Sequence, residues 1–245
     1  MRHFWHHFER PPLGGGLDVR IWEEEGHEWL QLPGDPPLQF DDPWTLAEVL
    51  RYWLVEHAVQ RAQTTLPFHA ASLTREDTAV LFAGASGAGK TTLSVELAAA
   101  GWALGGDDIA PIDLASGRVH PFPKPLSVRR RELWDGLPPP PRGWSPPPAK
   151  GPRLVPADAF ARVTEPFSVT NLLFIAYEPD ESPSTEGLSP GQATALCVEY
   201  ARAGGPPAIS TLARLCRSAP AARIRYPTTS AAVTLIEDLV AKTEN

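Results

Sequence analysis

The sequence has few cysteines, no long apolar run and no excess of positive charge. Cys197 and Cys216 are its two cysteines in 245 residues, and because their spacing fits neither a metal knuckle nor a redox pair, we expect free, buried thiols and a cytoplasmic protein. Charged residues interrupt every stretch that approaches the roughly 18 apolar residues of a membrane span, and the first residues lack the apolar segment of a secretory signal. The net charge of −7 argues against general nucleic-acid binding.

Proline, in contrast, is abundant and unevenly placed. The chain has 28 prolines, of which 12 lie between Pro121 and Pro156, so this segment is expected to form neither regular helix nor central sheet. Charge is uneven as well. Residues 1–50 carry three basic and ten acidic side chains, whereas residues 117–153 carry eight basic and two acidic ones. A basic, proline-rich segment in an acidic chain predicts an anionic partner.

Hydrophobic periodicity predicts an α/β fold. Residues 17–32 alternate as a β-hairpin, and Asp42 followed by Pro43 begins a helix that continues to residue 63. Residues 66–73 and 78–83 are expected to form an antiparallel pair about a turn near Arg75 and Glu76, which places His69 opposite Phe82. The remaining predicted elements are strands at 102–114, 169–177 and 223–226 and helices at 91–100, 190–202, 208–217 and 229–241.

One segment matches the phosphate-binding loop pattern GxxxxGK[ST] at every position. A predicted strand precedes it and a predicted helix follows it, which is the context that this loop requires. Glycines let the backbone amides converge on phosphates, Lys90 reaches the terminal phosphates, and the Thr91 hydroxyl can bind Mg²⁺. The residues expected to bind the nucleotide are Gly84, Ala85, Ser86, Gly87, Ala88, Gly89, Lys90, Thr91 and Thr92.

Two carboxylates and a histidine are the further candidates. Asp107 and Asp108 follow Lys90 after a helix-length segment, so the chain has returned to the sheet when it reaches them. Such a pair can divide two tasks, one coordinating Mg²⁺ and one orienting or deprotonating a hydroxyl; the alternative is a solvated turn or a metal site without catalysis. His69 is expected beside the loop, where it could contact a phosphate or a carboxylate, although an apolar strand equally suits a core histidine.

These motifs, in this order, resemble the HPr kinase/phosphorylase family, and more closely its shorter relatives from peptide-modification gene clusters. The resemblance covers roughly residues 45–240 and rests on Phe68-His69-Ala70-Ala71-Ser72-Leu73, the loop at 84–91, residues 101–108 ending in Asp107-Asp108, and residues 120–129. It implies a nucleotide-binding core like that of phosphoenolpyruvate carboxykinase, with His69, Lys90, Asp107 and Asp108 in the active site. It adds Lys150 as a catalytic residue and Arg129 as a contact to the transferred phosphate.

The resulting interpretation is an ATP- and Mg²⁺-dependent kinase that phosphorylates a hydroxyl, most simply a serine of a protein or peptide. Its fold is expected to be a P-loop kinase core with a mixed sheet at residues 64–245, including a basic proline-rich loop at 121–156. A β-hairpin and helix extension at residues 1–63 would precede this core. Thr91 and Asp107 would hold the metal. A nucleotide-binding regulator that transfers nothing and a kinase of small hydroxylated molecules are the alternatives, and a homo-oligomer is left open; no nucleic acid or membrane is expected as a partner.

Overall fold

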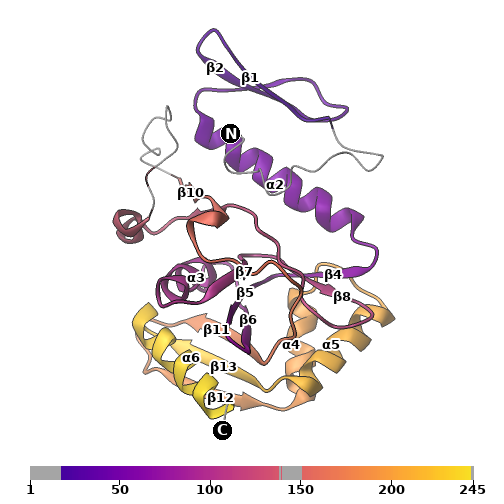
Figure 1. Ribbon diagram of the computed structural model, residues 1–245, viewed down its shortest axis with the longest axis vertical. Helices are drawn as coiled ribbons and strands as arrows, with labels where there is room; N and C mark the ends of the chain where they lie inside the picture. The colour runs from indigo at the N-terminus through magenta and orange to yellow at the C-terminus, as the bar shows by residue number, and fades with distance from the viewer. Residues whose placement is uncertain (1–17, 138, 140–150, 244–245) are drawn as a thin grey trace. The chain divides into compact units, whose positions relative to one another are not determined.

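A computed structural model describes residues 18–137, 139 and 151–243 (Figure 1). Contacts divide the chain into two units, a smaller one of residues 1–60 with 124–159 and a larger one of residues 61–123 with 160–245. In the part of the chain that the structure describes, no helix combines the length and the apolarity that crossing a membrane requires.

The larger unit is built on a mixed sheet of six strands in the order β12-β13-β11-β6-β5-β7. Strands β6, β11 and β13 are parallel neighbours, whereas β5 runs antiparallel to both β6 and β7, and β12 antiparallel to β13. The expected α/β class with a mixed sheet is therefore confirmed. The strands are β5 (Ala70–Arg75), β6 (Thr78–Ala83), β7 (Ala103–Gly106), β11 (Asn171–Tyr177), β12 (Ser184–Leu188) and β13 (Ala221–Tyr226).

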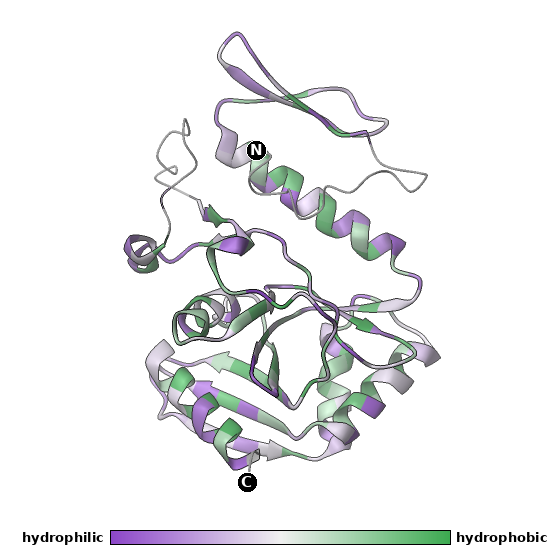
Figure 2. Cartoon of the chain, viewed as in Figure 1, coloured by the Kyte–Doolittle hydropathy of each residue, from purple (hydrophilic) through white to green (hydrophobic). Residues whose placement is uncertain are grey.

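Helices cover both faces of this sheet. α4 (Pro190–Tyr200) and α5 (Pro206–Ser218) pack on one face through a cluster that alternates along the strands, with Leu81 and Ala83 from β6 and Leu172 and Phe174 from β11. α3 (Lys90–Ala99) and α6 (Thr229–Thr243) pack against each other and against β5 and β13. Because successive strand residues point to opposite faces, this arrangement explains why β6 is buried along its whole length. Figure 2 colours the chain by hydropathy and shows apolar residues (green) along strands of this sheet.

Both cysteines lie where these helices meet. Cys197 of α4 and Cys216 of α5 are buried and free, as expected, with their Sγ atoms 3.7 Å apart.

Two strands that were predicted to be continuous are each interrupted. Residues 66–73 divide at His69 into β4 (Thr65–Phe68) and β5, and residues 102–114 divide at residues 107–109 into β7 and β8 (Ala110–Asp113). β4 pairs with β8 in a separate two-stranded sheet, while β5 and β7 belong to the large one. The prediction failed because apolar residues of strand type lie on both sides of each interruption, and only the backbone reveals the change of sheet.

The predicted hairpin register was also wrong. Arg75 faces Thr78 around a two-residue turn, so Ala71, and not His69, lies opposite Phe82. The turn residue Glu76 has φ +52, the left-handed conformation that such short turns favour. His69 nevertheless lies directly before β5, beside the end of β6.

The smaller unit contains the N-terminal elements together with the middle of the chain. β1 (Arg20–Glu24), β2 (His27–Gln31) and β3 (Leu38–Phe40) form an antiparallel sheet, which confirms the predicted hairpin and adds a strand to it. α2 (Pro43–Arg61) begins as predicted, because the Asp42 carboxylate accepts bonds from the amides of Trp44 and Thr45, both at 2.9 Å.

The proline-rich region contacts these N-terminal elements, whereas the sequence assigned it to the core. β9 (Leu126–Val128) pairs with β10 (Arg153–Val155), the Ser127 hydroxyl donates to Glu48 of α2, and Leu154 joins the cluster beneath α2. Two short 3-10 helices, η2 (Arg131–Gly136) and η3 (Ala157–Ala159), follow β9 and β10. As expected, the described part of the region has no α-helix and adds no strand to the large sheet.

A charged contact fixes α6 beside the end of β5. Arg75 forms a two-point ion pair with Glu237 at 2.9 and 2.5 Å, and the Trp102 indole donates to the same carboxylate at 3.0 Å. The Arg75 guanidinium also lies 4.4 Å from the centre of the Trp102 ring. The hydrogen bonds from Arg75 hold the pKa of Glu237 below its usual range.

We predict that Glu237→Gln lowers the free energy of unfolding by about 1 kcal/mol at neutral pH, a value reduced because the pair is about one-third exposed. Because the folded-state pKa is lowered, the contribution of Glu237 is complete above its unfolded-state pKa of about 4.3 and is lost as the pH falls through the lowered folded-state value. Urea unfolding across this pH range should show the variant and the wild type converging in acid. Glu181→Gln, at an exposed glutamate, is the control, and a difference that does not depend on pH would contradict the assignment.

Candidate active site

The topology brings the predicted motifs to one edge of the large sheet. The loop at residues 84–89 follows β6, and Asp107 and Asp108 follow β7. Since β5 is antiparallel to both strands, its first residues lie at the same edge, and His69 directly precedes them. The structure thus assembles the loop, the carboxylate pair and the histidine from three separate segments.

The loop lies between a strand and a helix, as its sequence pattern predicts. It connects the end of β6 to α3, whose first amides lack partners within the helix and point toward the loop. Gly84 is enclosed so tightly that a Cβ would lie 2.6 Å from the carbonyl oxygen of Ile175. Gly89 has φ +92, and its Cβ would lie 2.5 Å from the hydroxyl oxygen of Tyr226, which itself donates to the Ala88 carbonyl. The glycines therefore let the backbone pack where side chains would collide.

Lys90 lies folded over this loop. Its Nζ donates to the carbonyl oxygens of Gly84 at 2.6 Å and Ala85 at 3.3 Å, and the side chain is buried. Burial lowers the pKa of Lys90, and the charges of Asp108 and Asp107 partly oppose this shift. A cation that is poorly solvated and held beside a glycine loop is suited to accept an anion, because a phosphate would restore the interactions that burial removed.

Thr91 and Asp107 form the pair expected to hold a metal. Asp107 is buried directly after β7, and the Thr91 hydroxyl lies 3.1 and 3.2 Å from its two carboxylate oxygens. Hydroxyl and carboxylate oxygens are ligands that suit Mg²⁺, which normally completes its shell with phosphate oxygens and water. Among the residues described, no three His, Cys, Asp or Glu side chains cluster as a metal site of their own. The pair therefore fits a Mg²⁺ that arrives with a nucleotide.

His69 contacts the second carboxylate. Its Nδ1 lies 2.9 Å from the carbonyl oxygen and 3.0 Å from the carboxylate Oδ1 of Asp108. Both partners are acceptors, so Nδ1 carries the proton and the ring fixes the position of the carboxylate. Asp108 has φ +80, an uncommon conformation that ends β7 and turns its side chain out of the strand pattern. With a side chain 29% exposed, Asp108 remains open to an incoming group, whereas Asp107 is enclosed.

Arg202 is a cation of the site that the sequence analysis missed. Its backbone amide donates to the Pro67 carbonyl at 2.9 Å, and the amide of His69 donates to the Tyr200 carbonyl at 2.8 Å, so residues 200–202 lie along the end of β4. An isolated bridge between Phe68 and Ala201 lies between these bonds. Arg202 is exposed, and its charge is the smallest of the influences on the pKa of Lys90, after burial and the charges of Asp108 and Asp107.

The sequence analysis missed both Arg202 and Tyr226, and the two residues differ in how far a sequence pattern could have indicated them. Arg202 follows α4 in an Ala- and Gly-rich stretch with no recognisable pattern. Tyr226, by contrast, ends a predicted strand that is parallel to the strand of the loop, and that position could have indicated it.

Two predicted residues are not placed at this edge. Lys150 lies outside the described residues. Arg129 follows β9 in the smaller unit, and its contact with phosphate stays a prediction. The other expected site residues, including Thr92 in the first turn of α3, belong to the larger unit.

Comparison with known proteins adds no relative. No model of a protein family matches the chain, and no curated protein matches it in sequence.

Proposed function

We propose that the protein is an ATP-dependent kinase of the HPr-kinase-like type, which transfers the γ-phosphoryl group to a hydroxyl, most simply a serine of a protein or peptide. The observation that carries the proposal is the meeting, at one sheet edge, of a complete phosphate loop with two carboxylates in different environments. Phosphoryl transfer depends on positioning and on charge compensation, and this edge supplies groups for both.

Lys90 and the amides of the loop and of α3 would hold the β- and γ-phosphates. Thr91 and Asp107 would hold Mg²⁺, which supplies charge neutralisation on the phosphate oxygens when it is bound. When a phosphate binds, Nζ of Lys90 would leave the neutral carbonyls of Gly84 and Ala85 and bond to a charged oxygen instead. This exchange favours binding, because charge-assisted hydrogen bonds are stronger than neutral ones.

Asp108 is the residue proposed to accept the proton of the attacking hydroxyl. It is more exposed than its neighbour, and His69 holds its carboxylate from one side through Nδ1. His69 acts through Asp108 in this proposal and is a positioning residue. Because Asp107 is buried and Asp108 is partly exposed, this assignment is favoured over the reverse one, in which Asp107 would be the base and Asp108 would hold the metal.

Arg202 would compensate charge on the terminal phosphate. The backbone bonds of residues 200–202 with Pro67 and His69 hold Arg202 at the end of β4, directly beside the histidine of the site. A guanidinium also matches the oxygens of a phosphate in two-point geometry.

Lys90→Ala should weaken binding of MgATP by about a hundredfold, because it removes a charge-assisted hydrogen bond worth about 3 kcal/mol. Isothermal titration calorimetry measures this directly, and Lys242→Ala, at an exposed lysine of α6, is the matched control. Equal affinities for the variant and the wild type would show that the loop is not a working nucleotide site.

Asp108→Asn should retain MgATP binding and reduce phosphoryl transfer by about 10²–10⁴-fold, the usual contribution of a positioned base. Asparagine keeps an oxygen for His69, so the fold is preserved. Asp107→Asn should instead raise the Mg²⁺ concentration needed for half-maximal activity.

Transfer of label from γ-labelled ATP to candidate proteins and peptides is the assay for both aspartates, with free serine as the small-molecule comparison. A protein that binds ATP tightly but labels no acceptor would instead be a nucleotide-dependent regulator. Full transfer activity in both aspartate variants would make the carboxylate pair structural.

Arg202→Gln should weaken binding of MgATP by about tenfold and leave MgADP binding unchanged, because the proposed contact is to the phosphate that ADP lacks. Arg202→Lys should recover part of the difference. Arg217→Gln, at an exposed arginine of α5, controls for loss of a positive charge. Equal losses for ATP and ADP would assign Arg202 to the fold or to the inner phosphates instead.

A further inference from the structure

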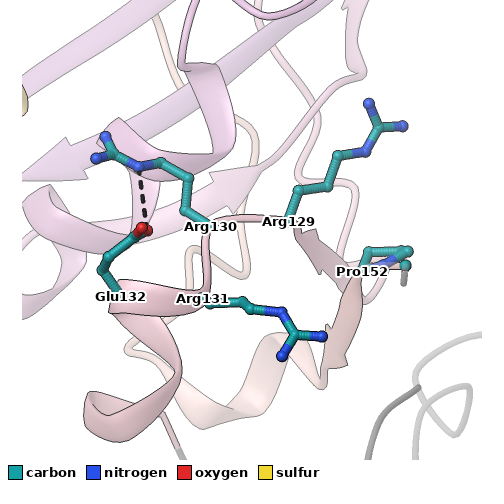
Figure 3. A pocket seen from close by; sticks show the side chains of 6 residues that line it. Arg129, Arg130, Arg131, Glu132 and Pro152 are labelled. Atoms are coloured by element: carbon teal, nitrogen blue, oxygen red, sulfur yellow. Dashed lines mark ion pairs between the residues drawn. The ribbon is translucent and has the colours of Figure 1, made fainter. Parts of the chain in front are cut away.

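Three consecutive arginines line a groove in the smaller unit. Arg129, Arg130 and Arg131 lie where β9 ends and η2 begins, and Glu132, Gly151 and Pro152 complete the described lining. Figure 3 shows the side chains of Arg129 and Arg131 on the side of Pro152, whereas Arg130 turns toward Glu132. The groove encloses about 490 Å³. All three arginines are exposed, and they come from the basic proline-rich segment for which the sequence predicted an anionic partner.

Hydrogen bonds from side chains hold the backbone around this groove in place. The Trp134 indole donates to the Val128 carbonyl at 3.1 Å, and the guanidinium of buried Arg153 donates to the Trp134 carbonyl at 2.7 Å. The Arg131 guanidinium lies 4.9 Å from the centre of the Trp134 ring. The cations therefore extend from a turn that is tied to both β9 and β10, which reduces the entropy lost when a ligand binds.

The described residues that line the groove carry three positive charges and one negative charge. The carboxylate among them, Glu132, contacts Arg130 at 3.6 Å with both side chains more than half exposed, a geometry that contributes little stability. Arg129 and Arg131 add two further positive charges to the same surface. Closely spaced guanidinium groups repel one another, and an anion bound between them removes that cost.

The net charge of the chain favours an acidic peptide over a nucleic acid as the partner of this groove. A nucleic acid extends far beyond the groove and would meet the repulsion of a protein with net charge −7. The part of an acidic peptide that contacts the groove meets mainly the field of the local arginines, because charges further away than about one Debye length, roughly 8–10 Å at physiological salt, are largely screened. Carboxylates also match the planar fork of arginine.

We propose that this arginine groove binds an acidic segment of polypeptide and is the docking site for the protein or peptide that the kinase phosphorylates. Its role in presenting an acceptor rests on the proposed function. Binding of the acidic segment does not, because the lining residues that the structure describes all belong to the smaller unit and lie outside the loop at residues 84–89.

The probe is a fluorescein-labelled peptide of about 12 residues built from Glu and Ala, with a Lys and Ala peptide and a single-stranded oligonucleotide of similar length as comparisons. Fluorescence anisotropy with the full-length protein should show binding of the acidic peptide that weakens as salt is raised. Replacing Arg129 and Arg131 together by Glu should weaken it by at least about tenfold. The double Gln variant, which retains side-chain length without charge reversal, should give a smaller loss in the same direction.

Two controls separate this proposal from the kinase assignment. Arg217→Glu reverses an exposed charge in the larger unit and should leave peptide binding unchanged. Lys90→Ala, which removes the phosphate-loop cation, should also bind the acidic peptide normally, even if no phosphoryl transfer exists. Equal affinity of the wild type and both groove variants, or tighter binding of the oligonucleotide than of the peptide, would overturn the proposal.

Discussion

The candidate site depends on an antiparallel ladder that opens in its middle. At one end of the ladder, Thr65 of β4 pairs with Asp113 of β8. Further along, Ser72 of β5 pairs with Gly106 of β7, and this is the same pair that would result if the register of β4 and β8 continued without a break. Between these pairs the two chains separate for three residues each, and the separated residues include His69, Asp107 and Asp108. The opening is therefore bounded by regular pairing of β4 with β8 on one side and, on the other, by the pair of Ser72 with Gly106, directly after which the register of β5 and β7 shifts. Polar side chains enter it because the backbone there no longer bonds across the pair, and the amide of His69 finds the Tyr200 carbonyl instead.

Electrostatics explains why the surrounding groups tolerate burial. Lys90 and Asp107 are both enclosed, and an isolated buried charge is costly unless a partner compensates it. Here the carbonyls of the loop and the Thr91 hydroxyl provide that compensation. Each of these is a neutral partner that a phosphate or a metal ion can replace. A site of this kind is stable without its ligand and still gains when charged groups arrive, because the ligand brings stronger partners than those it displaces.

Much of the fold could be predicted from the sequence, but the connections inside the site could not. The glycine loop is recognisable because its chemistry restricts the residues at each position, and Asp42 with Pro43 marks the start of α2 for a similar local reason. By contrast, β12 consists mostly of exposed residues and has little apolar pattern that could predict it. The break between β4 and β5 at His69 was not predicted either, because the residues before and after it are equally hydrophobic. The hairpin register depended on a positive φ at Glu76, a residue type that rarely signals one. Arg202 reaches the site through pairing with Pro67, which no local pattern encodes.

The contact between Tyr226 and Ala88 joins residues that are 138 positions apart. The loop at residues 84–89 is synthesised long before β13, the strand that supports it and the last strand of the large sheet in chain order. A chain emerging from the ribosome carries the complete loop sequence long before β13 can pack beside it, and contacts of such large separation form late because their loop-closure cost is high. Under the proposed function, ATP would bind the finished fold in preference to partly folded chains and would stabilise the protein only once its synthesis had passed residue 226.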